Sequence, residues 1–133
     1  MKAKLLITLI AIGLFTSCNP KSELRVNLKT STLVNDNPNH KDSIYVVNSE
    51  YFEIGLYSYT DLQNVTYSAK KEIEQSNISE VFKMVTLSVV DASNKDVVYN
   101  NSTEFLNYMS ERGYEMTDQE KFKYRTDYTF KKK

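Results

Sequence analysis

The chain has 133 residues, of which 17 are basic and 17 acidic, so its formal net charge is zero. This balance gives no electrostatic reason to expect nucleic acid as a partner. The single cysteine and single histidine exclude an internal disulfide and a structural zinc site made of such residues, and they do not support a histidine-based catalytic triad.

Residues 1–17 have the pattern of a signal peptide. Lys2 and Lys4 precede an apolar run, Leu5 to Phe15, that is too short for a permanent transmembrane helix. The small residues just before Cys18 resemble the lipobox of bacterial lipoproteins, although Phe15 stands where leucine is commonest. The resemblance implies cleavage before Cys18 and anchoring of the acylated Cys18 in a membrane of the bacterial cell envelope. An ordinary secretory signal and an uncleaved anchor are the alternatives.

Residues 18–42 are expected to be the lipidated cysteine followed by a flexible tether. The segment is rich in Asn, Lys, Ser, Thr and Asp and contains both prolines, Pro20 and Pro38. Such a spacer would hold the domain away from the membrane. Apolar residues alternate over 23–29, so an edge strand there is an alternative. Ser43, in Asp-Ser-Ile, matches a short bacterial O-glycosylation pattern and is a candidate modification site.

Residues 43–133 are expected to form one domain that begins with β-type patterns. Gly55, inside the first full strand, suggests a bulge. Residues 70–75 have helix propensity, so the sequence does not define where the second strand ends. The expected β segments are an apolar run at 44–47, three strands at 51–59, 65–69 and 81–90, and a short return strand at 97–99.

One helix follows, and its end signals are complete. Asn101 or Ser102 can cap its N-terminus, with Glu104 completing a capping box, and Gly113 ends it. One face of the helix carries three apolar residues at one-turn spacing, Phe105, Leu106 and Met109.

A closing hairpin is expected after the helix. Residues 114–117 form a short strand, 118–120 a polar turn, and 122–130 a strand with alternating Phe, Tyr and Thr. We interpret this aromatic row as core packed against the helix rather than as a stacking platform. The grouping predicts an α+β domain, an antiparallel sheet of about four to six strands with one main helix on one face.

The helix and hairpin resemble a group of small uncharacterised bacterial exported proteins and lipoproteins. Its members share a helix that reads Leu-Asn-x-Met-x-x-x-Gly-Trp-Glu, matched here by Leu106 to Glu115 with Tyr114 in place of Trp. Asn94 stands where the group usually has glycine. The resemblance implies the α+β fold, and it brings no activity and no catalytic residue.

No motif in the chain indicates catalysis, a cofactor or a metal site. We therefore predict a non-enzymatic, lipid-anchored interaction module, bound to the membrane by its acyl chains, with an unknown protein or glycan partner. The alternative is a glycan or small-ligand binding protein that uses an exposed sheet face with Tyr51, Tyr57 and Tyr59. A hydrolase that uses only carboxylates is a third hypothesis, and it needs two acidic groups in one cleft.

Overall fold

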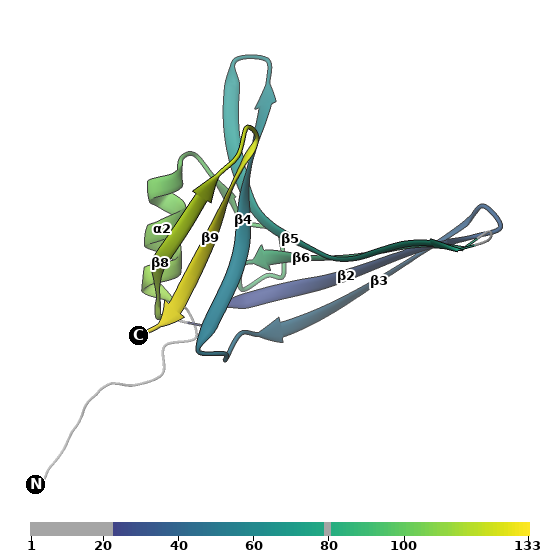
Figure 1. Cartoon of the computed structure of the whole chain (residues 1–133), viewed down its shortest axis with the longest axis horizontal. Coiled ribbons are helices and arrows are strands. Elements are labelled where there is room, and N and C mark those ends of the chain that lie inside the picture. The colour runs from purple at the N-terminus through teal and green to yellow at the C-terminus, as the bar shows by residue number, and fades with distance from the viewer. Residues whose placement is uncertain (1–22, 79–80) are drawn as a thin grey trace, which may run out of the picture.

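The computed structural model describes residues 23–78 and 81–133, which form one antiparallel sheet and one helix (Figure 1). The signal peptide and Cys18 lie outside the described residues. The elements in chain order are β2 (Arg25–Val34), β3 (Asn37–Val46), β4 (Tyr51–Asp61), β5 (Asn64–Ile78), β6 (Val81–Val90), β7 (Val98–Tyr99), α2 (Ser102–Glu111), β8 (Tyr114–Lys121) and β9 (Arg125–Lys132).

The expected α+β class is wrong, because the domain is β-rich. Strands take up 69% of the described residues and the helix 9%. Two segments account for most of the difference. Residues 25–46, expected largely as a tether, form two strands, and residues 70–75, with their helix propensity, lie inside β5. Backbone pairing on the sheet overrides a weak local preference here.

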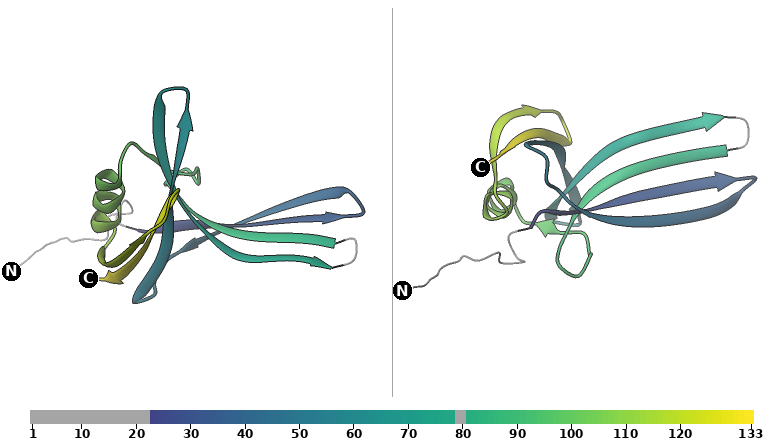
Figure 2. Two further views of the ribbon diagram at one scale, coloured as in Figure 1. Left: turned by 45° about the horizontal axis from the view of Figure 1, so that its top comes forward. Right: turned by 90° about the horizontal axis from the view of Figure 1, so that it is seen from below.

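The strand order is β3-β2-β6-β5-β4-β9-β8, with β7 beside β5. The long strand β5 changes partner along its length: its first part pairs with β4, and from Lys70 onward it pairs with β6, with a register shift between Glu72 and Glu74. The sheet therefore divides into two parts (Figure 1). We call β2, β3, β6 and residues 71–78 of β5 the arm, which extends away from the part that carries α2 (Figure 2).

The core lies between α2 and one face of β4, β9 and β8. The ring of Phe105 lies 5.4 Å from that of Tyr128 and 5.6 Å from that of Phe130, between centroids. Helix packing onto the end of the aromatic row is therefore confirmed. The buried cluster also includes Leu24, Val26, Phe52, Ile54, Leu56, Ala69, Val89, Tyr99, Met109 and Tyr114.

Both ends of α2 match their predicted signals. The Asn101 side chain accepts a hydrogen bond from the Glu104 N–H at 2.8 Å. The Glu104 carboxylate accepts from the N–H of Asn100, one residue earlier than a standard capping box requires. After the helix, Gly113 has φ +89°, the left-handed conformation that suits glycine.

The closing hairpin turns later than expected. β8 runs through Lys121, so residues 118–120 lie in a strand, and the turn lies at 122–124. Phe122 and Tyr124 are 46% and 67% exposed, so the prediction that they belong to the core is wrong. A register shift between Met116 and Asp118 places one additional residue in β8. The residues of β8 after Tyr114 are all exposed, so they show no alternation of apolar and polar side chains.

The expected tether is wrong over residues 25–42, which form most of the β2–β3 hairpin. A two-residue turn joins the strands, and Asn35 and Asp36 both have positive φ there, 49° and 64°. The alternative, an edge strand at 23–29, correctly predicts a strand there. This strand is not at the edge of the sheet, because β2 lies between β3 and β6. Residues 25–42 therefore belong to the same sheet as the strands of the expected domain at 43–133.

Candidate ligand-binding site

The face of β4 opposite α2 carries a hollow of about 280 Å³. Strand register brings its residues together, because Gly55 pairs with Lys70 of β5 and with Asp127 of β9, and Tyr57 pairs with Arg125. Paired residues point to the same face of a sheet. We call this site the Gly55 hollow, and its main lining side chains are Glu53, Tyr57, Lys70, Glu72, Arg125 and Asp127.

Gly55 is needed at the floor of this hollow for space. Its φ is not positive, its pairing with β9 runs through it without a register shift, and its pairing with β5 starts at it, so the expected bulge is wrong. A Cβ atom on Gly55 would lie 2.9 Å from Asp127 Oδ1 and 3.2 Å from the ring of Tyr57. The missing side chain lets these two groups lean across the strand, which is a recognised use of glycine within a strand.

Arg125 and Asp127 form one wall of the hollow. Arg125 Nε donates a hydrogen bond to Asp127 Oδ1 at 2.9 Å, and this contact raises the pKa of Arg125. Tyr57 lies opposite Arg125 in the β4–β9 register. The wall therefore combines an aromatic ring with two planar charged groups.

The other wall contains Lys70, whose Nζ lies 5.1 Å from the centroid of the Tyr59 ring. Burial raises the pKa of Tyr59, but hydrogen bonds with Lys70 and Ser68 outweigh it, so this pKa lies below its usual value. Glu53 and Glu72 are absent from the ion pairs found among the described residues. Both residues are exposed.

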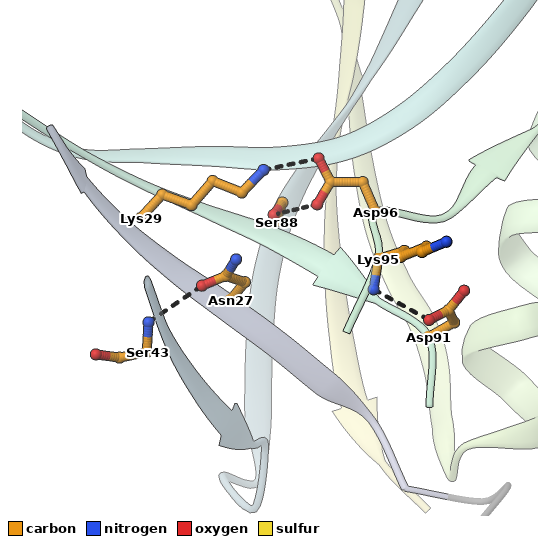
Figure 3. Close-up of polar contacts among 7 residues, drawn as sticks. All are labelled: Asn27, Lys29, Ser43, Ser88, Asp91, Lys95 and Asp96. Atoms are coloured by element: carbon orange, nitrogen blue, oxygen red, sulfur yellow. Dashed lines mark hydrogen bonds and ion pairs between the residues drawn. The ribbon is translucent and has the colours of Figure 1, made fainter. Parts of the chain in front are cut away.

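Next to Lys70, a cluster of polar side chains lies on the arm, and Figure 3 shows its members Lys29, Ser88 and Asp96. Ser88 pairs with Lys70 across β5 and β6, and its hydroxyl donates to Asp96 at 3.0 Å. Lys29 Nζ donates to the other oxygen of Asp96 at 2.8 Å. Burial raises the pKa of Asp96, but the hydrogen bonds from Lys29 and Ser88 outweigh it and hold that pKa below its usual value.

The three tyrosines predicted as a ligand face lie on one side of β4 but do not share one site. Tyr57 is half-buried and lines the Gly55 hollow, and Tyr59, 44% exposed, contacts Lys70. Tyr51 is 57% exposed and lies six residues from Tyr57, about 20 Å along a strand. Its neighbour is Lys131, at 5.9 Å.

The candidate O-glycosylation residue, Ser43, lies in β3 rather than at the end of a tether. Its N–H donates to the buried Asn27 side chain at 3.2 Å (Figure 3). The modification remains a prediction. His40, expected in the same tether, also lies in β3, with Nδ1 3.0 Å from the hydroxyl of Ser31.

Within residues 23–78 and 81–133, no group of three or more His, Cys, Asp or Glu side chains is placed to hold a metal ion. In the same residues, no helix has the length and apolar character needed to cross a membrane.

Comparisons of the chain with protein-family models, with curated proteins and with solved structures gave no significant match. The resemblance of the helix and hairpin to a group of small bacterial proteins therefore remains a prediction.

Proposed function

We propose that this protein is a non-enzymatic binding protein of the bacterial cell envelope, anchored by acyl chains on Cys18, whose domain binds a glycan in the Gly55 hollow. The lipobox pattern before Cys18 supports the anchor. The observation that carries the binding function is the hollow itself, a concave site with an aromatic ring and convergent polar groups.

A glycan suits the chemistry of the hollow better than a strongly charged ligand. Lys71 also lines the hollow, so it has three basic residues beside three acidic ones and their formal charges cancel. The ring of Tyr57 can stack on the apolar face of a sugar. Arg125, Asp127 and Glu53 can form charge-assisted hydrogen bonds with hydroxyl groups, which are stronger than neutral ones.

The test is binding of a panel of defined cell-envelope glycans to the wild type, measured by calorimetry. Tyr57→Ala should weaken binding by about tenfold, which corresponds to the loss of one aromatic contact. Gly55→Ala should also weaken it, because the new methyl group displaces Asp127 and Tyr57. Tyr51→Ala is the matched control from the same face and should bind as the wild type does.

A protein partner is the second candidate, because three exposed aliphatic side chains form a row at the tip of the arm. Val34, Val81 and Ile78 are register partners on three adjacent strands and share one face. Exposed apolar rows of this kind often mark interaction sites. Failure of every glycan to bind the wild type would contradict the first proposal and favour this second one.

A further inference from the structure

Leu24 already belongs to the core of the folded domain, so the domain lies much closer in sequence to Cys18 than the expected tether would place it. Leu24 is buried, and its carbonyl accepts a hydrogen bond from the N–H of Val47 at 2.7 Å. Only residues 19–23 separate it from Cys18. Even a fully extended chain of this length spans only about 20 Å. An acylated Cys18 would therefore hold this end of the domain beside the bilayer.

The C-terminal end of β9 lies at the same end of the domain. Residues 47–50, which join β3 to β4, link the two chain ends. Val47 contacts Leu24, and the Lys132 N–H donates to the carbonyl of Glu50 at 2.7 Å. Lys132 Nζ also donates to the Asn48 side chain at 3.2 Å. The arm points away from this end (Figure 2).

Exposed amphipathic side chains gather around this junction. Tyr45, Val46 and Tyr51 flank residues 47–50 and are all exposed. Lys131 Nζ lies 5.9 Å from the centroid of the Tyr51 ring. Tyrosine and lysine are typical of the membrane interface, because each combines an apolar body with a polar tip.

The junction carries both acidic and basic side chains. This mixed charge favours contact with the interfacial zone of a bilayer through apolar side chains rather than a purely electrostatic contact with the lipid head groups. Glu50 and Glu115 accompany Lys131–Lys133, and Glu115 pairs with Lys131 across β8 and β9. Attraction to anionic lipid alone is therefore weak. The exposed aromatic side chains supply the apolar contact.

We infer that this end of the domain rests on the phospholipid bilayer that holds the acyl chains. We call it the anchor end, defined by Tyr45, Val46, Tyr51 and Lys131–Lys133. The inference rests on the proposed acylation of Cys18. In this orientation the arm extends away from the lipid, and Tyr51 serves membrane contact rather than glycan binding.

Energy transfer to the membrane tests the orientation. The acylated protein is reconstituted into vesicles of phosphatidylethanolamine and phosphatidylglycerol that carry an acceptor dye on the lipid head groups. Because Cys18 is blocked by lipid, a single introduced cysteine takes the donor dye. Val46→Cys and Asn37→Cys lie at opposite ends of β3, about 30 Å apart. Transfer should be clearly stronger from position 46, and equal or stronger transfer from position 37 would overturn the inference.

A matched pair of double variants tests whether the aromatic side chains set this orientation. Combining Tyr45→Ser with Tyr51→Ser should reduce the difference in transfer between positions 46 and 37 by about half or more. Combining Phe122→Ser with Tyr124→Ser removes two exposed rings at the β8–β9 turn and should leave the difference unchanged. An equal effect of the two pairs would overturn the assignment of the anchor end.

Failure of the anchor can be distinguished from failure of the orientation. Radiolabelled palmitate should enter the wild type and not Cys18→Ala. Equal labelling of both would overturn the anchor and the orientation together. Specific labelling without a difference between positions 46 and 37 would overturn only the orientation.

Discussion

Two glycines illustrate how the same residue type meets different physical needs. Gly113 has φ +89°, and a Cβ there would meet nothing within 4 Å, so only its backbone conformation requires glycine. Gly55 has an ordinary strand conformation, but a Cβ would crowd Asp127 and Tyr57. The first need depends on local helix geometry and was predicted. The second depends on a neighbouring strand and was misread as a bulge.

The contacts of Asp96 predict a pH-dependent contribution to stability. Its pKa is lower in the folded than in the unfolded protein, so its ion pair with Lys29 stabilises the fold fully above about pH 4 and is lost as pH falls through the folded pKa. Because both side chains are partly exposed, Asp96→Asn should lower the free energy of unfolding by only about 0.5–1 kcal/mol at neutral pH.

Urea denaturation of the wild type and Asp96→Asn at neutral pH and in acid measures this difference. It should shrink towards zero below the folded pKa. A difference that stays constant between the two conditions would show that the ion pair does not contribute as the geometry indicates.

Among the elements, α2 was predicted well and the closing hairpin only in part. The helix carries its own end signals in Asn101 and Gly113, so its bounds follow from local residues. The hairpin turn depends on how β8 pairs with β9, including the register shift after Met116. No local residue pattern indicates that shift.

Phe105 should be the residue of α2 that contributes most to stability. It is fully buried and packs against Tyr99, Tyr128 and Phe130. Phe105→Ala should lower the free energy of unfolding by about 3–5 kcal/mol, because it leaves a cavity in the core. Leu106→Ala, at the half-buried neighbouring position, should cost clearly less. Equal losses for the two variants in chemical denaturation would contradict this packing.

The whole molecule combines a packed part, with α2 over the sheet, and a single-layered arm. Among the described residues, no helix lies over the arm (Figure 1). Val26 of β2 and Val89 of β6 belong to the core where the arm joins the packed part. Beyond that junction the strands are held mainly by backbone hydrogen bonds and cross-strand contacts, and the edge strand β3 is mostly exposed. Regions with few buried apolar contacts open with a lower free energy than the core.

Amide hydrogen exchange should therefore differ between the two parts. The amides of β3 should exchange at least about tenfold faster than those of β4, which pairs with β9 and lies under α2. Exchange followed by mass spectrometry of proteolytic fragments resolves the two strands. Uniform protection across β3 and β4 would indicate that the arm is covered by another surface in solution.

The sequence was sufficient to predict those elements whose structure depends on residues close together in the chain. The alternation of apolar and polar side chains predicted strands at 51–59 and 81–90, and it placed Tyr57 on the strand face opposite the core residues Phe52, Ile54 and Leu56. Both follow from short-range chemistry, because side chains on a half-buried strand repeat every second residue.

Pairing between strands decided the rest. β3 is polar along most of its length and shows no alternation, because both faces of the arm meet solvent. Its strand form comes from hydrogen bonds to β2. Likewise, Lys70 reaches Tyr57 through the register of the β4–β5 hairpin, and Arg125 and Asp127 reach it through the pairing of β4 with β9, a strand distant in sequence. Such contacts depend on which backbone groups pair across the sheet, and no stretch of neighbouring residues specifies them.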